Sequence, residues 1–141
     1  MIGTKIQKPV KNGNEYTELA NWCNANNARI VDNGEYYEAI ENPAPTTEEI
    51  QFQLTEAVQS ALDSFAKTRG YDGIMSACSY SNSTDAQFKL EADYCIALRD
   101  TTWRTGYAIL AEVKAGTRPI PSAEELIAEL PVGSAKWPDE E

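Results

Sequence analysis

The fold is decided by residues 46–70, TTEEIQFQLTEAVQSALDSFAKTRG. Apolar side chains recur there every three or four residues over about four turns, which is the period of one helix face. Thr46 or Thr47 is a typical N-cap, and Glu48 and Glu49 lie in the first turn, where the helix dipole favours acids. The terminal glycine closes the run, so the stretch predicts an amphipathic helix. Its apolar stripe consists of Ile50, Leu54, Ala57, Val58, Ala61, Leu62 and Phe65.

A second, longer helix is predicted over residues 85–115, because its small and apolar residues also recur at helical steps. Gly106 thins the stripe in mid-helix, a feature that permits close approach of another helix or a kink. The connection over residues 71–84 is short, so we expect the two helices to form an antiparallel hairpin. The stripe consists of Phe88, Ala92, Cys95, Leu98, Thr102, Gly106, Ile109 and Val113.

The N-terminal region carries different signals. Residues 1–14 hold three lysines and no acid, and we expect an exposed basic arm. A short helix is predicted over residues 15–26, and the Asn33-Gly34 pair between two strand-like runs predicts a β-hairpin with a type I′ turn.

The register that follows from this turn places Val31 opposite Tyr36 and Arg29 opposite Glu38. One face of the hairpin would then pack on the short helix. The other face, with Val31, Tyr36 and the complementary Arg29–Glu38 pair, would meet water or a partner.

Two prolines in the segment after the hairpin predict a stiff, extended linker. We expect an α+β protein in which a small helix and β-hairpin module (1–42, including the basic arm) and a linker (43–47) precede a helical hairpin domain (48–118). Ser122 and Glu125 form a capping box that predicts a short helix, and this helix and an acidic tail make up the last segment (119–141).

Composition narrows the classes of function. The chain has 22 acidic and 12 basic side chains, a formal charge of −10 and a pI near 4.5. Proteins that track nucleic-acid phosphates need clustered Lys and Arg, so we expect no nucleic-acid partner. The chain contains no histidine, which excludes Ser-His-Asp and Cys-His catalysis within it.

The three cysteines, Cys23, Cys78 and Cys95, are widely spaced and odd in number. They are typical of small buried hydrophobes rather than of a disulfide framework or a zinc site. No run of about 18 apolar residues is present, so we expect no membrane partner. We also expect no cofactor, no metal, no small-molecule substrate and no enzymatic activity.

The candidate partner-binding residues form two groups. Val31, Tyr36 and Glu38 lie on the hairpin face that is free of the short helix. Arg99 and Trp103 lie on the long helix, where they would form a small anion-binding or aromatic patch. A structural role is the alternative for both groups, as a solvated face with one partly buried aromatic side chain.

A family resemblance lies in the second half of the chain. It is carried by the run RGYDGIMSACSY (69–80) and by Phe88, Glu91-Ala92, Tyr94-Cys95, Arg99-Asp100, Trp103 and the exit GTRP (116–119). In these features the sequence resembles small proteins encoded beside tail-fibre genes in tailed phages and prophages. The resemblance spans about residues 48–121 and implies a tail-fibre role, with no catalytic residues to carry over.

We therefore expect a structural or adaptor protein of a phage tail, which binds a tail-fibre or baseplate protein, copies of itself, or both. It would be found in the virion tail after assembly in the host cytoplasm. The alternative is a tail-fibre assembly chaperone that is absent from the mature virion. A receptor-binding module that uses Tyr36 and Trp22, and an enzyme with convergent acids, are further hypotheses that no motif supports.

Overall fold

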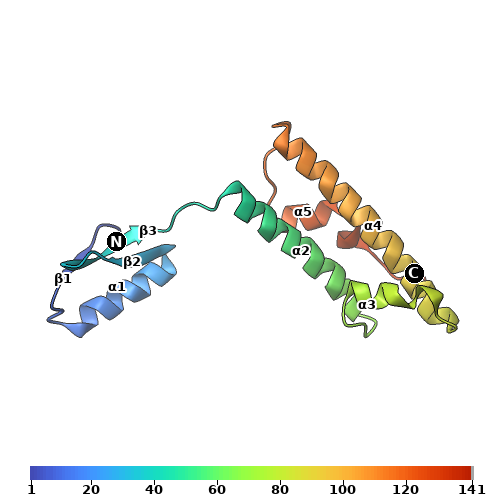
Figure 1. Ribbon diagram of the computed structural model, residues 1–141, viewed down its shortest axis with the longest axis horizontal. Helices are drawn as coiled ribbons and strands as arrows, with labels where there is room; N and C mark the ends of the chain where they lie inside the picture. Colours follow the sequence, from blue (N-terminus) through green and yellow to red (C-terminus); the bar gives the residue numbers. More distant parts are fainter. Residues whose placement is uncertain (141) are drawn as a thin grey trace. The chain divides into compact units, whose positions relative to one another are not determined.

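A computed structural model describes residues 1–140 and divides the chain into two compact units, Met1–Pro45 and the segment that begins at Thr46. Each unit has its own hydrophobic core. The first unit contains a small antiparallel sheet, and the second is helical (Figure 1). The predicted α+β class is confirmed.

The N-terminal unit packs one helix on a three-stranded sheet with the order β1-β3-β2. Its elements are β1 (Lys5–Gln7), α1 (Gly13–Ala25), β2 (Ala28–Asp32) and β3 (Tyr36–Glu41). The expected exposed basic arm is wrong, because residues 5–7 pair with β3 and Ile6 is buried. The strand was missed because it is only three residues long and its single buried side chain lies between the exposed polar residues Lys5 and Gln7.

The β2–β3 register differs from the prediction by two residues. Val31 lies opposite Glu38 instead of Tyr36, and Arg29 lies opposite Ile40, so the predicted Arg29–Glu38 pair is wrong. A slip of two residues keeps every side chain on its face. The predicted division into faces is therefore confirmed. The core of this unit joins Leu19 and Cys23 of α1 to Ile6, Ala28 and Ala39 of the sheet.

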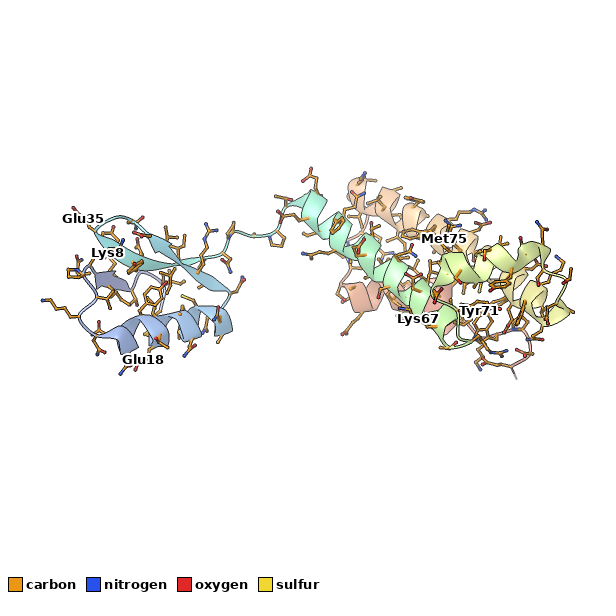
Figure 2. All side chains as sticks on the ribbon, turned by 60° about the horizontal axis from the view of Figure 1, so that its bottom comes forward. Lys8, Glu18, Glu35, Lys67, Tyr71 and Met75 are labelled. Atoms are coloured by element: carbon orange, nitrogen blue, oxygen red, sulfur yellow. The ribbon has the colours of Figure 1, made fainter. Side chains whose placement is uncertain are left out.

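The turn explains the shift. The Asn33 N–H donates to the Tyr36 carbonyl at 3.0 Å, which leaves Gly34 and Glu35 as the two turn residues. Gly34 has a φ of 87° and Glu35 does not have a positive φ, the pattern of a type II′ turn with glycine in first place. The Gly34 N–H also donates to the Asp32 carboxylate at 2.8 Å. Figure 2 shows Glu35 at the tip of the hairpin with Lys8 near it.

The helical unit contains two long helices that run antiparallel, as predicted (Figure 1). The expected direct packing of one on the other is wrong, because their backbones come close at almost no position and short helical segments contact both of them. Short helical segments connect them and follow them. The elements are α2 (Thr47–Lys67), α3 (Ile74–Cys78), the 3-10 helix η1 (Ser79–Asn82), α4 (Ala86–Lys114), α5 (Ala123–Glu129) and the 3-10 helix η2 (Pro131–Ser134).

Local hydrogen bonds fix where these helices begin. Thr46 and Glu49 form a reciprocal capping box at α2. The Asp63 carboxylate of α2 accepts the Ile74 N–H at 2.9 Å, so α2 holds the first turn of α3. Asp85 caps α4 through two backbone N–H groups.

The predicted stripes supply five of the twelve buried apolar residues in the core of the helical unit, and the rest come from segments outside the stripes. Phe88 is exposed, and its ring contacts Tyr80 instead of the core. Gly106 makes no close contact with another helix, because a Cβ there would meet nothing within 4 Å, and α4 continues through it. The buried apolar residues are Val58, Leu62, Ala66, Ile74, Ala77, Cys95, Leu98, Ile109, Leu126, Leu130, Val132 and Trp137.

The expected acidic tail is wrong for the described residues, because the segment after α5 folds onto the helical unit. Trp137 is 2% exposed and stacks on Phe65 of α2, with ring centroids 4.4 Å apart. Its indole N–H donates to the Thr68 hydroxyl at 2.9 Å. Arg69 pairs with Asp139 at 2.6 Å, so the acids that resemble a solvated tail fasten the chain end.

Leu62 tests the stripe of α2, because its side chain is fully buried. Leu62→Asp buries an unpaired charge, and we expect it to destabilise the helical unit by about 3 kcal/mol or more. Ser64→Asp adds the same charge at an exposed position of α2 and serves as the control. Circular dichroism during thermal unfolding measures both variants, and equal midpoints would remove Leu62 from the core.

Asp139 makes the fastening of the chain end sensitive to acid. Its hydrogen bond to Arg69 lowers the pKa of Asp139 below the usual 3.8. A pKa that is lower in the folded state stabilises the protein at neutral pH, and this contribution is lost as pH falls through the folded pKa.

We therefore expect Asp139→Asn to lower the melting temperature at pH 7 and to have a smaller effect near pH 3. Asp100→Asn, at an exposed position of α4, is the control. A difference from the wild type that is the same at both pH values would contradict this assignment.

Candidate docking cleft

The outer face of the N-terminal sheet carries three of the predicted partner-binding residues. Val31 and Glu38 are directly opposite each other, and Tyr36 lies two residues before Glu38 on the same face. All three are partly buried. The Lys5 ammonium lies 4.5 Å from the centre of the Tyr36 ring, and Glu38 accepts a hydrogen bond from Asn33, so this face is already held by local contacts.

The other two predicted residues lie on α4 of the helical unit. Trp103 lines an open cleft, and its ring centroid is 6.2 Å from that of Tyr107. Arg99 is one turn earlier and does not line the cleft. Burial raises the pKa of the Cys78 thiol, and the charge of Arg99 opposes this rise. The structure thus brings Val31, Tyr36 and Glu38 together on one face, whereas Trp103 lines the cleft without Arg99.

The cleft is formed by both long helices of the helical unit. It has a volume of about 320 Å³ and lies between the first half of α2 and the second half of α4, and residues of the α4–α5 connection and of α5 also line it. The lining residues are Thr47, Ile50, Gln51, Leu54, Thr55, Val58, Trp103, Gly106, Tyr107, Ile109, Leu110, Val113, Lys114, Ile120, Pro121 and Leu126.

The chemistry of this lining suits a partner with an apolar surface. Lys114 is its single charged residue. Tyr107 is 65% exposed and Ile120 is also exposed, so large apolar groups meet water at the mouth of the cleft. Tryptophan and tyrosine are the residues that most often dominate the binding energy at protein interfaces.

Gly106 keeps the cleft open on the α4 side. A glycine in the middle of a helix costs about 1 kcal/mol relative to alanine. The backbone and the packing do not require glycine at this position, since Gly106 has no positive φ and a Cβ would meet nothing within 4 Å. Any side chain at residue 106 would enter the space that the cleft provides.

A cluster at the opposite end of the helical unit has a structural role. The buried Glu91 carboxylate accepts hydrogen bonds from Arg69 at 2.9 Å and from the Tyr71 hydroxyl at 3.0 Å. Burial and the bond to Glu91 raise the pKa of Tyr71 to about 12. Tyr71 lies near the end of α2 (Figure 2). Because Arg69 also holds the chain end through Asp139, these groups join the two long helices to the C-terminal segment.

The described residues offer little to metal or thiol chemistry. Among residues 1–140, no three His, Cys, Asp or Glu side chains are grouped so that they would hold a metal ion. The three cysteines are free; Cys23 and Cys95 are buried, and burial raises the pKa of Cys95 to about 12. A buried thiol with this pKa stays protonated near neutral pH and is a poor nucleophile.

The sequence pointed to Trp103 but missed the rest of the cleft. Ile50 and Leu54 belong to the predicted stripe of α2, where they were assigned to the core, yet both remain partly exposed. Gly106 was interpreted as a point of close approach. The combination of a mid-helix glycine with Trp103 and Tyr107 within one turn of it was the available signal.

Comparisons of the chain with protein-family models, curated proteins and solved structures find no match. Within the described part of the chain, no helix combines the length and apolar character that a membrane crossing requires.

Cys95 gives a direct check of the thiol assignment. We expect it to resist alkylation by iodoacetamide at pH 8 in the native protein and to react after denaturation, because its thiol is buried and protonated. Mass spectrometry of digested samples measures the modified fraction, and Cys95 in the denatured protein is the internal control. Rapid labelling of native Cys95 would show that this thiol is accessible and ionised.

Proposed function

We propose that the protein is a structural or adaptor protein of a bacteriophage tail that binds a tail-fibre or baseplate protein. Its work is binding rather than catalysis. It takes its place in the virion tail after assembly in the host cytoplasm, and copies of the chain are a second class of partner.

The observation that carries the proposal is the open apolar cleft between α2 and α4, with Trp103 and Tyr107 at its side. A pocket of this kind is the surface by which a small protein holds an apolar element of another protein. Apart from Thr47 and Leu126, the residues that line the cleft fall within residues 48–121, the segment that resembles proteins encoded beside tail-fibre genes.

The two-unit construction supports an adaptor. Each unit has a core of its own, and a proline-rich segment separates them. The outer face of the sheet, with Val31, Tyr36 and Glu38, and the cleft of the helical unit are two distinct surfaces. An adaptor needs two such surfaces in order to join two neighbours.

Two measurements test the proposal. We expect co-expression with the product of the adjacent fibre gene to give a stable complex in size-exclusion chromatography with light scattering. We also expect mass spectrometry to find the protein in gradient-purified phage particles. A host protein of similar size and charge, measured in the same particle preparation, controls for carry-over.

The outcomes separate the two classes of tail protein. A complex with the fibre protein and presence in the particles support the adaptor. A complex together with absence from the particles overturns the adaptor in favour of an assembly chaperone. A monomer near 15.6 kDa that ignores the fibre protein and is absent from particles would overturn both.

A further inference from the structure

We infer that the cleft receives an amphipathic helix of the partner protein, with Lys or Arg beside its apolar stripe, and that one of its side chains enters the space over Gly106. This deepens the proposed function and rests on it only for the identity of the partner as a tail protein. The length, lining and charge of the cleft each bear on the occupant.

The length of the cleft matches one short helix. On α2 the lining runs from Thr47 to Val58, and on α4 from Trp103 to Lys114. At 1.5 Å per residue, each wall is about 16 Å long, or about three helical turns. The cleft therefore has two walls of equal length, and a third helix of about three turns would extend along both of them.

Gly106 indicates that a side chain of another protein fills the space next to it in the cleft. No group within 4 Å would oppose a Cβ at this position. A side chain on α4 would therefore have filled the cleft and favoured the helix. A residue that lowers helix stability without improving the packing of the fold is expected at functional positions. The benefit of glycine at this position would be room for a side chain of the partner.

The charge around the cleft selects a basic partner. The segments that build it, residues 47–58 and 103–130, contain seven acidic and three basic side chains. Arg118 is already paired with Glu129 at 2.8 Å and lies near Glu112. The remaining acids form no ion pair within the described residues; they are Glu48, Glu49, Glu56, Glu124 and Glu125.

All five acids are exposed, and Glu48 and Glu125 are next in the chain to the lining residues Thr47 and Leu126, whereas Glu49 and Glu56 lie on the opposite face of α2. The lining has one charge of its own, Lys114. An apolar stripe on the partner matches the lining, and Lys or Arg at its flanks matches the surrounding carboxylates. A helix with acidic flanks would meet repulsion from the same groups.

Gly106→Leu gives the sharpest test, because it fills the cleft without adding charge. We expect the variant to fold, with a melting temperature equal to or above that of the wild type. The probe is a fluorescein-labelled, helix-stabilised peptide of about four turns, with a leucine stripe flanked by lysines. Fluorescence anisotropy should show that Gly106→Leu weakens its binding by about tenfold or more.

Phe52→Ala is the matched control. Phe52 is 65% exposed, as Tyr107 is, but it lies on α2 outside the cleft. We expect Phe52→Ala to bind the peptide as the wild type does, and Tyr107→Ala to bind it more weakly. A second peptide with glutamates in place of the lysines should bind the wild type at least about tenfold more weakly.

Equal binding of the lysine peptide to the wild type and Gly106→Leu would overturn the inference, since the peptide would then be held by acidic surface alone. Equal affinity for the two peptides would overturn the basic character of the partner. A dimer of the wild type that Gly106→Leu disperses would assign the cleft to a second copy and would also overturn it.

The same variant separates this inference from the proposed function. Loss of fibre-protein capture in Gly106→Leu, with capture retained in Phe52→Ala, supports both. Capture that persists in Gly106→Leu overturns the cleft as the docking site and leaves the adaptor role standing. If the wild type captures no fibre protein and is absent from particles, the adaptor role fails and the peptide comparison decides the cleft.

Discussion

The burial of Trp137 is the contact on which the helical unit depends. Its ring lies between α2 and α4, with centroids 4.4 Å from Phe65 and 6.1 Å from Tyr94. Arg69 covers the same ring and binds the buried Glu91 of α4. These contacts join the end of α2 to the beginning of α4. No such contact joins the first half of α2 to the second half of α4, and the cleft lies between these two halves.

Secondary structure followed from the sequence wherever one periodic signal dominated. The apolar stripes located α2 and α4, and the capping residues Thr46 and Ser122 marked where helices begin. The hairpin register was less determined, because both Asn33-Gly34 and Gly34-Glu35 are acceptable two-residue turns. The faces were still correct, since the two alternatives differ by an even number of residues.

Segments without a repeating apolar pattern could not be predicted from the sequence. The strand at residues 5–7 has one buried side chain, and the segment after α5 has an acidic composition that resembles a solvated tail. In both cases distant partners decide the structure: β3 pairs with the first segment, and Phe65, Thr68 and Arg69 hold the second. The cleft was hidden for the same reason, because a cavity depends on where helices separate.

The proline-rich segment between the two units sets a limit on how far apart two bound neighbours can be. Residues 42–45 lie between β3 and the cap of α2, and four residues in an extended proline-rich conformation span about 12 Å. Once one unit is attached, the other samples only a small volume around that point. Near its own partner, the second unit would have an effective concentration in the millimolar range. Two contacts that are weak individually would then bind the protein with high avidity.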